Sequence, residues 1–123
     1  MRKILLVEDE KLLIDLYKKE LEKEGFEVEV AENGIEAEKK LKSQKFDLVL
    51  LDILMPKMSG DELLEKIKKE RFTEKVPFIV ISNFDTPEIR KKVGYLGAKK
   101  YILKTDLTPK KLVEIVKKEL QGV

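Results

Sequence analysis

The chain has 123 residues, the usual length of one domain, and it contains neither cysteine nor histidine. These absences exclude disulfides, thiolate chemistry, zinc-finger spacings and imidazole acid–base catalysis, so any bound metal must have oxygen ligands. Charged residues make up 41% of the chain, but they nearly cancel at a net charge of +2. Because basic and acidic residues are interleaved, the composition argues against a nucleic-acid-binding patch.

Short apolar runs typical of strands alternate with longer segments that have helical spacing. In chain order, strands are expected at residues 3–7, 26–31, 48–51, 77–81 and 101–103. The first and third runs are continuously apolar, as in strands that are covered on both faces. The second run alternates between apolar and polar residues, so we expect it at an edge of the sheet.

Each strand is followed by a segment that is expected to form a helix. The apolar residues expected on the inner faces are, helix by helix, Leu12, Leu13, Leu16 and Leu21; Ile35, Ala37 and Leu41; Leu63, Leu64 and Ile67; Ile89, Val93 and Leu96; Leu112, Ile115 and Val116. The boundary signals are Gly25 after the first helix, Thr86 before Pro87 at the fourth, and Asp106 or Thr108 before Pro109 at the fifth.

This alternation predicts an α/β fold, in which a five-stranded parallel sheet is doubly wound with five helices. The expected strand order is 2-1-3-4-5, the flavodoxin-like arrangement. Ligands of such sheets bind beyond the carboxyl ends of the strands.

Polar residues at the carboxyl ends of four strands are therefore expected to meet at one edge. They are Glu8 and Asp9 after the first strand, Asp52 after the third, Ser82 at the fourth and Lys104 at the fifth. Each has a simpler structural explanation: the aspartates could cap helices, the serine could begin a turn, and the lysine could be exposed. Together, three crowded carboxylates raise one another's pKa unless a cation is present, which favours a bound dication.

Carboxylates, a backbone carbonyl and water are ligands that suit Mg²⁺, with Mn²⁺ as a substitute. Beside such an ion, Asp52 could act as a nucleophile toward phosphorus, because the metal and Lys104 neutralise phosphoryl oxygens. An aspartyl phosphate would add roughly one negative charge and three acceptor oxygens. Ser82 and Lys104 are the donors at hand.

The whole chain, residues 1–123, resembles the receiver domain of response regulators, of the small chemotaxis or sporulation-relay type. The resemblance is carried by the segments ILLVEDE, AENGIEA, DLVLLDILMPKMSG, VIS and LGAKKYILK. It implies that Asp52 is the phosphoacceptor. It also implies that Asp9, Asp52 and the backbone carbonyl of Leu54 bind Mg²⁺ with the help of Glu8.

The resemblance further implies that Ser82 and Lys104 bind the phosphoryl group and that the rotamer of Tyr101 reports the state of the switch. The alternative for Tyr101 is an ordinary half-buried strand aromatic.

The chain departs from the family pattern beside two of these residues. Thr105 stands where proline is usual, often after a cis bond. A cis Lys104–Thr105 bond would cost about 3 kcal/mol, which favours trans, but the sequence leaves both isomers open. Asn83 stands where a small residue is usual.

Leu54 and Phe84 occupy the positions that flank the path of a hydrolytic water, and both are apolar. They predict a long-lived phosphorylated state, with Asn83 as the one nearby amide that could compensate.

The resemblance implies a phosphorylation-activated switch and not an enzyme, although the chain would promote its own phosphorylation and dephosphorylation on Asp52. Because the chain has no histidine, a separate histidine kinase or phosphotransfer protein must supply the phosphoryl group. The output surface is expected on the fourth helix, fifth strand and fifth helix, which would bind an unknown output protein or a second copy. A protein partner would be acidic and would dock at Lys91 and Lys92. We expect no direct nucleic-acid binding and no membrane binding by this domain, and a cytoplasmic location.

The sequence fits three other classes of protein less well. A phosphatase with an aspartate nucleophile, of the haloacid dehalogenase type, needs a second acid two residues later, where this chain has Leu54. A flavin carrier needs a Ser/Thr/Gly-rich loop after the first strand, where this chain reads EDEKLL. A receiver-like scaffold that never accepts phosphate is compatible with the fold, but the intact five-residue site argues against it.

Two expectations concern the chain as a whole. Nothing follows the fifth helix, so the chain is either a stand-alone receiver or an excised domain. Its charged residues are mostly Lys and Glu, the bias associated with proteins of thermophiles.

Overall fold

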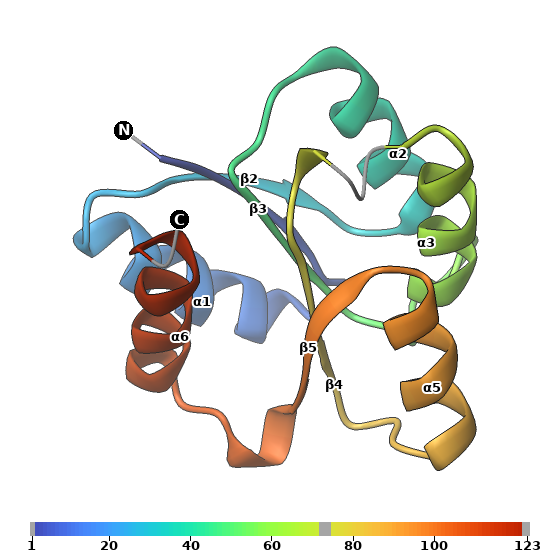
Figure 1. Cartoon of the computed structure of the whole chain (residues 1–123). Helices are drawn as coiled ribbons and strands as arrows, with labels where there is room; N and C mark the ends of the chain where they lie inside the picture. Colours follow the sequence, from blue (N-terminus) through green and yellow to red (C-terminus); the bar gives the residue numbers. More distant parts are fainter. Residues whose placement is uncertain (1, 72–74, 122–123) are drawn as a thin grey trace.

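A five-stranded parallel sheet forms the middle layer of the protein in the computed structural model, which describes residues 2–71 and 75–121 (Figure 1). The strands are β1 (Lys3–Val7), β2 (Glu27–Ala31), β3 (Leu48–Leu51), β4 (Phe78–Ser82) and β5 (Ala98–Leu103). Their order is β2-β1-β3-β4-β5, which confirms the predicted fold and places the alternating β2 at an edge. β5 begins earlier than predicted because its first residues include exposed lysines, which hide an edge strand from an apolar pattern.

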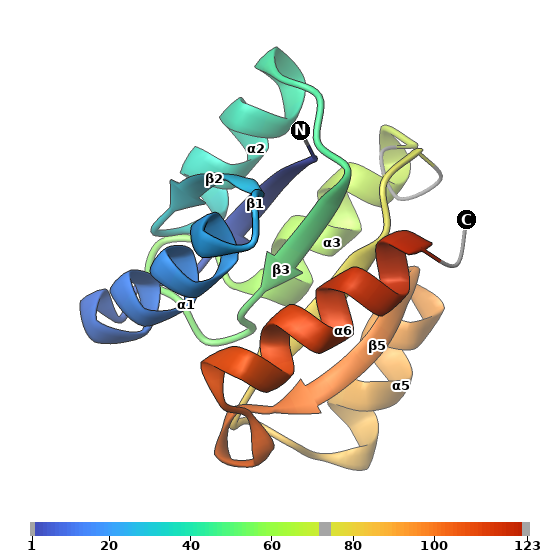
Figure 2. The same cartoon turned by 90° about the vertical axis from the view of Figure 1, so that its left-hand side faces the viewer.

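Helices cover both faces of the sheet (Figures 1 and 2). α1 (Lys11–Lys23) and α6 (Pro109–Gln121) lie on one face, and α2 (Gly34–Ser43), α3 (Gly60–Lys69) and α5 (Pro87–Tyr95) lie on the other. A single 3₁₀ turn, η1 (Lys104–Asp106), follows β5. The fourth and fifth helices expected from the sequence are therefore α5 and α6.

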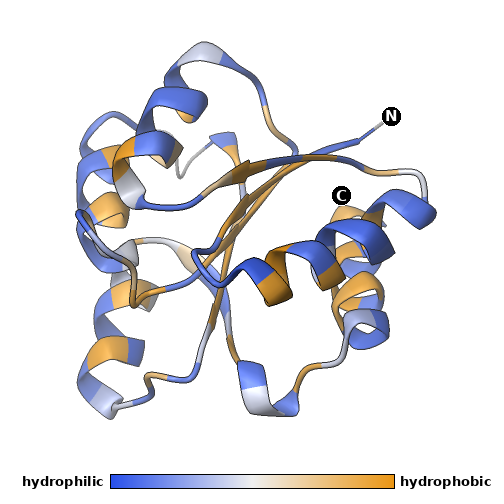
Figure 3. Ribbon diagram, turned by 180° about the vertical axis from the view of Figure 1, so that it is seen from behind, coloured by the Kyte–Doolittle hydropathy of each residue, from blue (hydrophilic) through white to orange (hydrophobic). Residues whose placement is uncertain are grey.

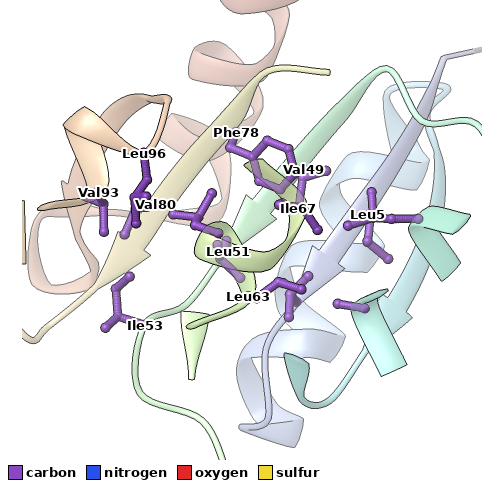
Figure 4. Close-up of a cluster of buried hydrophobic side chains, with 14 of the residues drawn as sticks. Leu5, Val49, Leu51, Ile53, Leu63, Ile67, Phe78, Val80, Val93 and Leu96 are labelled. Carbon is purple, nitrogen blue, oxygen red and sulfur yellow. The ribbon is translucent and has the colours of Figure 1, made fainter. Parts of the chain in front are cut away.

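The core consists of two apolar layers, one on each face of the sheet. In β1, Ile4 and Leu6 point to the side of α1 and α6, whereas Leu5 and Val7 point to the side of α2, α3 and α5. Figure 4 shows the second layer, where Leu5 and Phe78 from the strands meet residues of the helices. Apolar residues line the inside of the helices, and polar residues cover their outer surfaces (Figure 3). Continuous apolar strands thus follow from burial on both faces.

The predicted inner face of α1 is confirmed only in part, because Leu21 is buried and Leu13 packs against the core but the other two predicted leucines do not. Leu12 and Leu16 are 72% and 44% exposed, and the buried residues of this helix are Ile14, Tyr17 and Leu21. Apolar residues almost encircle the first turns, so the pattern left the rotation of the helix open, and the three- and four-residue spacing through Tyr17 determines it. In α2 the same error affects Ile35, which is 40% exposed.

The predicted helix boundaries are confirmed. The Thr86 hydroxyl accepts a hydrogen bond from the backbone N–H of Ile89, and Gly25 adopts a positive φ of 91° after α1. At α6, Thr108 and not Asp106 acts as the cap, because its hydroxyl accepts from the N–H of Lys111.

Candidate functional site

Four strands deliver polar side chains to the carboxyl edge of the sheet, as predicted. Glu8, Asp52 and Ser82 are 2%, 5% and 1% exposed, so these polar groups are enclosed by protein. Asp9 beside them is half-buried. One carboxylate oxygen each from Glu8, Asp9 and Asp52 lies within 4.8 Å of the others.

Lys104 reaches into the middle of this acidic cluster. Its ammonium lies 2.9 Å from Glu8 Oε1 and 2.9 Å from Asp52 Oδ2, and its side chain is only 8% exposed. Glu10 Oε1 lies further out, at 3.7 Å. The alternative that Lys104 is an exposed lysine is therefore wrong. Burial of this charge is tolerated because two carboxylates hydrogen-bond to it.

The electrostatics of the cluster differ between its members. Burial raises the pKa of Glu8, and the charge of Asp52 adds to this effect, while the hydrogen bond from Lys104 opposes it. Burial alone would lower the pKa of Lys104, but its bonds to Asp52 and Glu8 outweigh burial and hold the pKa above its usual value. Lys104 therefore stays charged at neutral pH.

The donor set fits a divalent hard cation. When all four groups are ionised, three carboxylates and one ammonium leave two uncompensated negative charges in a largely buried cluster. All the side-chain donors are oxygens, which Mg²⁺ and Mn²⁺ accept. A dication would therefore relieve the repulsion that Lys104 alone leaves.

The loop after β3 fixes Asp52 from both sides. The N–H of Asp52 donates to the carbonyl of Val7 at 3.0 Å, and the N–H of Gly60 donates to the carbonyl of Ile53 at 2.8 Å. A Cβ on Gly60 would lie 2.2 Å from the carbonyl oxygen of Asp52, so only glycine permits α3 to start this close. The N–H of Leu54 lies 3.3 Å from Asp52 Oδ1.

Helix capping does not explain the two aspartates, whereas a turn does form at Ser82. The residue that caps α3 is Ser59, and the residue at the start of α1 is Glu10, so neither Asp52 nor Asp9 is a helix cap. Ser82 does begin a turn, because its hydroxyl accepts from the N–H of Phe84 at 3.1 Å. That bond also leaves the serine hydroxyl hydrogen available to another acceptor.

Tyr101 is attached to the same turn. Its hydroxyl donates to the carbonyl of Phe84, and the guanidinium of Arg90 lies 4.6 Å from the centre of its ring. Arg90 is in turn paired with Asp85. Burial and the charge of Asp85 raise the pKa of the Tyr101 hydroxyl. The tyrosine therefore joins β5 to the loop that follows Ser82.

Sequence reasoning missed one contact beside the site. The N–H of Thr105 donates to Asn83 Oδ1 at 3.1 Å. The Lys104–Thr105 bond, whose isomer the sequence left open, is trans, since the described residues contain no cis peptide. Asn83 and Thr105 follow the ends of β4 and β5, where Ser82 pairs with Leu103, so the strand register that makes them partners is seen only in the structure.

Two of the residues predicted to tune the lifetime of a phosphate are exposed apolar side chains at this edge. Leu54 is 57% exposed and Phe84 is 39% exposed. Each is two residues after a site residue, Asp52 or Ser82, and each gives its backbone N–H to that residue.

Comparison with known proteins gives one consistent family. Residues 4–117 match the family model "Response regulator receiver domain". The phosphate regulon transcriptional regulatory protein PhoB of Rhizobium meliloti is 35% identical over 113 residues, which are 92% of this chain and 50% of that protein. The chain spans about half the length of the curated relatives it matches, or less.

Solved structures agree with the fold. A CheY-like receiver domain from Methanospirillum hungatei superposes with a TM-score of 0.91 at 35% identity, covering 99% of this chain and 95% of the other. The response regulator TrrA of Thermotoga maritima, solved in complex with Mg²⁺-BeF, has a TM-score of 0.81 at 38% identity and covers 96% and 98% of the two chains. Among the described residues, no helix is both long and apolar enough to cross a membrane.

Proposed function

The chain belongs to the response-regulator receiver family, and from this premise we propose that it is a cytoplasmic switch in which Asp52 accepts a phosphoryl group. The observation that carries the proposal is the buried Asp52 carboxylate, bonded to Lys104 and grouped with Glu8 and Asp9. A carboxylate that only stabilised the fold would not need two further acids beside it.

In the proposed reaction, an oxygen of Asp52 attacks the phosphorus of a phosphohistidine or of a small phosphodonor. The new O–P bond forms as the bond to the leaving group breaks. An imidazole leaving group takes a proton from solvent, whereas a carboxylate such as acetate leaves as an anion. Lys104 remains an ammonium throughout and moves its hydrogen bond from the carboxylate to a phosphoryl oxygen. The Ser82 hydroxyl donates to a second phosphoryl oxygen.

Asp9, Asp52 and the Leu54 carbonyl would hold Mg²⁺ with the help of Glu8. The ion would supply positive charge that offsets the phosphoryl oxygens. The Mg²⁺-BeF complex of the Thermotoga relative supports this assignment, and Mn²⁺ is the expected substitute.

Phosphorylation would be passed on through the turn that follows β4. When the Ser82 hydroxyl donates to the phosphoryl group, the turn that it holds at Phe84 moves with it, and Tyr101 is bonded to the carbonyl of Phe84. The rotamer of Tyr101 would then change the surface of α5, β5 and α6. That surface would bind an output protein or a second copy of the chain, and we assign it no nucleic-acid contact.

A separate histidine kinase or phosphotransfer protein would be the donor. The exposed Leu12 and Leu16 lie on α1, the helix that follows Glu8 and Asp9, and they offer such a protein an apolar contact. Leu12 and Leu16 are four residues apart, so they lie on the same face of α1.

The test is incubation with Mg²⁺ and acetyl phosphate, followed by intact-mass measurement. We expect one phosphate per chain, which hydroxylamine removes and which is lost in Asp52→Asn. The matched control is Asp47→Asn, an exposed aspartate at the other end of β3, which should be phosphorylated normally. No phosphate on wild type, or multiple turnover of an unrelated phosphate ester, would contradict the proposal.

We also propose that Leu54 and Phe84 prolong the phosphorylated state because neither side chain can orient an attacking water. The variant Leu54→Asn/Phe84→Glu should shorten the phosphate half-life, by on the order of 10²-fold, since a polar group there can position or activate water. The control is Leu16→Asn, another exposed leucine. An unchanged or longer half-life in the double variant would show that apolar shielding does not set the lifetime.

A further inference from the structure

We propose that Asn83 is a positioning residue that aims Lys104 at Asp52 through the backbone of Thr105. The inference rests on the proposed phosphoryl transfer to Asp52, and it concerns how this chain keeps its lysine in place. Its starting observation is the 3.1 Å hydrogen bond from the N–H of Thr105 to Asn83 Oδ1.

The two residues are neighbours because of the strand register. Ser82 at the end of β4 pairs with Leu103 at the end of β5, so the next residues, Asn83 and Lys104, leave the sheet side by side. One turn therefore carries both Ser82, which is buried at the carboxyl edge of the sheet, and Asn83, whose amide oxygen bonds to the backbone that follows Lys104. The two predicted donors to a phosphoryl group are linked through this pair.

A single peptide group decides where the lysine points. This is the peptide group between Lys104 and Thr105. The Lys104 carbonyl accepts a hydrogen bond from the N–H of Leu107 at 3.1 Å, and the Thr105 N–H donates to Asn83. Both polar atoms of the group are thus bonded, which fixes the peptide plane at the start of η1. The direction of the Lys104 side chain follows from that plane.

The lysine needs such help because its stem is flexible. Four methylene groups with rotatable bonds lie between the backbone and the ammonium. The ammonium nitrogen must nevertheless lie 2.9 Å from an oxygen of Glu8 and 2.9 Å from an oxygen of Asp52. Without the Asn83 oxygen, the Thr105 N–H would turn to water, and the peptide plane could rotate. We expect a loss of about 3- to 10-fold in the phosphorylation rate, the usual range for one hydrogen bond.

The experiment is a double-mutant cycle with acetyl phosphate at saturating Mg²⁺. Asn83→Leu removes the acceptor at similar volume, and Thr105→Pro removes the N–H. We expect Asn83→Leu to slow phosphorylation in wild type and to have no further effect in Thr105→Pro, where no N–H remains to be held. Thr105→Ala is the matched control, because it keeps the N–H, and it should react at the wild-type rate.

A second readout follows the lysine directly. In metal-free protein labelled with ¹⁵N-lysine, the ammonium resonance of Lys104 should be resolved in wild type and Thr105→Ala, and shifted or broadened in Asn83→Leu. The melting temperature is measured in parallel; if Asn83→Leu does not fold, Asn83→Ala replaces it. A merely structural asparagine would change the melting temperature without this selective change at Lys104.

The outcomes separate the two proposals. An unchanged rate together with an unchanged Lys104 resonance in Asn83→Leu would overturn the positioning role, and so would an equal effect in the Thr105→Pro background. If wild type accepts no phosphate, the proposed function fails, and the resonance of Lys104 still decides whether Asn83 positions it.

Discussion

Two lysines of this protein each lie between two carboxylates at nearly the same distances. Lys104 is 2.9 Å from Glu8 and 2.9 Å from Asp52, and Lys92 is 3.0 Å from Asp61 and 2.8 Å from Glu65. The first group is almost completely enclosed, whereas the Lys92 side chain is 42% exposed. Contact geometry is therefore the same in the two groups, and burial distinguishes them.

The difference in burial changes what each group can do. The exposed group joins α5 to α3 and is screened by water, so it contributes little energy. The buried group holds charges that solvent cannot neutralise, so the removal or addition of one charge has a large effect. Lys92 bonds to two acids of α3, and both Lys91 and Lys92 are exposed, so docking of an acidic partner at these lysines stays a prediction.

The largest expected effect is that of Lys104→Met. Phosphorylation by acetyl phosphate should fall by on the order of 10²-fold, as for loss of one donor to a developing negative charge. Without metal, the free energy of unfolding should fall by about 3 kcal/mol, because two buried carboxylates lose their partner. Urea denaturation and mass spectrometry measure the two effects. If Lys92→Met lost as much phosphorylation rate and as much free energy of unfolding, the comparison would be contradicted.

Mg²⁺ should stabilise the folded protein only by binding at the buried group around Lys104. A ligand that binds the folded state alone raises the free energy of unfolding by about 1.4 kcal/mol for each tenfold rise above its Kd. We expect this dependence in wild type and in Asp61→Asn, and a much weaker one in Asp9→Asn. Denaturation at a series of Mg²⁺ concentrations measures it. Loss of the dependence in Asp61→Asn would place the metal at the wrong cluster.

A smaller effect is expected for Lys92→Met, at most about 1 kcal/mol in the free energy of unfolding. The effect should shrink when the salt concentration is raised, because exposed charges are screened. The effect of Lys104→Met should persist in the same salt. Denaturation of both variants at low and high salt tests the contrast, which fails if both losses shrink alike.

The smallest effect is a dependence on pH with opposite signs in the two groups. Burial opposes the shift, but hydrogen bonds from Lys92 and Ser59 lower the pKa of Asp61. The Asp61 carboxylate therefore adds to the free energy of unfolding above its unfolded pKa of about 3.9, and this addition is lost as the pH falls through the lower folded pKa. The part of the Lys92→Met effect that comes from Asp61, at most a few tenths of a kcal/mol, should vanish at low pH, as urea denaturation at a series of pH values would measure.

Glu8 has the opposite sign because its pKa is raised in the folded protein, chiefly by burial. Protonated Glu8 therefore adds to the free energy of unfolding below the usual glutamate pKa, and this addition is lost as the pH rises through the raised pKa of the folded protein. In metal-free protein, Glu8→Gln should therefore gain stability relative to wild type as the pH rises. A gain that disappears on raising the pH would show that burial does not dominate at Glu8.

Sequence patterns predicted the sheet and its carboxyl edge because strand ends in a parallel sheet lie together whatever the details of packing. Glu8, Asp52, Ser82 and Lys104 were found in this way. Which acids Lys104 would bond was beyond the pattern, because that depends on side-chain conformation. The rotation of α1 was mispredicted because Tyr17, a residue with a polar atom, lies on its buried face. The origin in a thermophile, which the Lys- and Glu-rich composition indicates, stays a prediction.

The contact between Asn83 and Thr105 shows a different limit. The sequence presented two separate departures from the family pattern, 22 positions apart, and only the register of β4 with β5 makes them partners. Long-range pairs of this kind involve a backbone N–H, which is present at every residue except proline and therefore leaves no signal in composition.

The distance along the chain between Asp52 and Lys104, 52 positions, has a consequence for protein synthesis. A nascent chain acquires its three acids early and the lysine that bonds to two of them only when β5 emerges. Until then the acidic edge lacks its internal cation and the sheet lacks its last strand. If Asp52 accepts a phosphoryl group as proposed, uptake of that group would mark finished molecules, so a small phosphodonor could be used to count correctly folded chains in a mixed preparation.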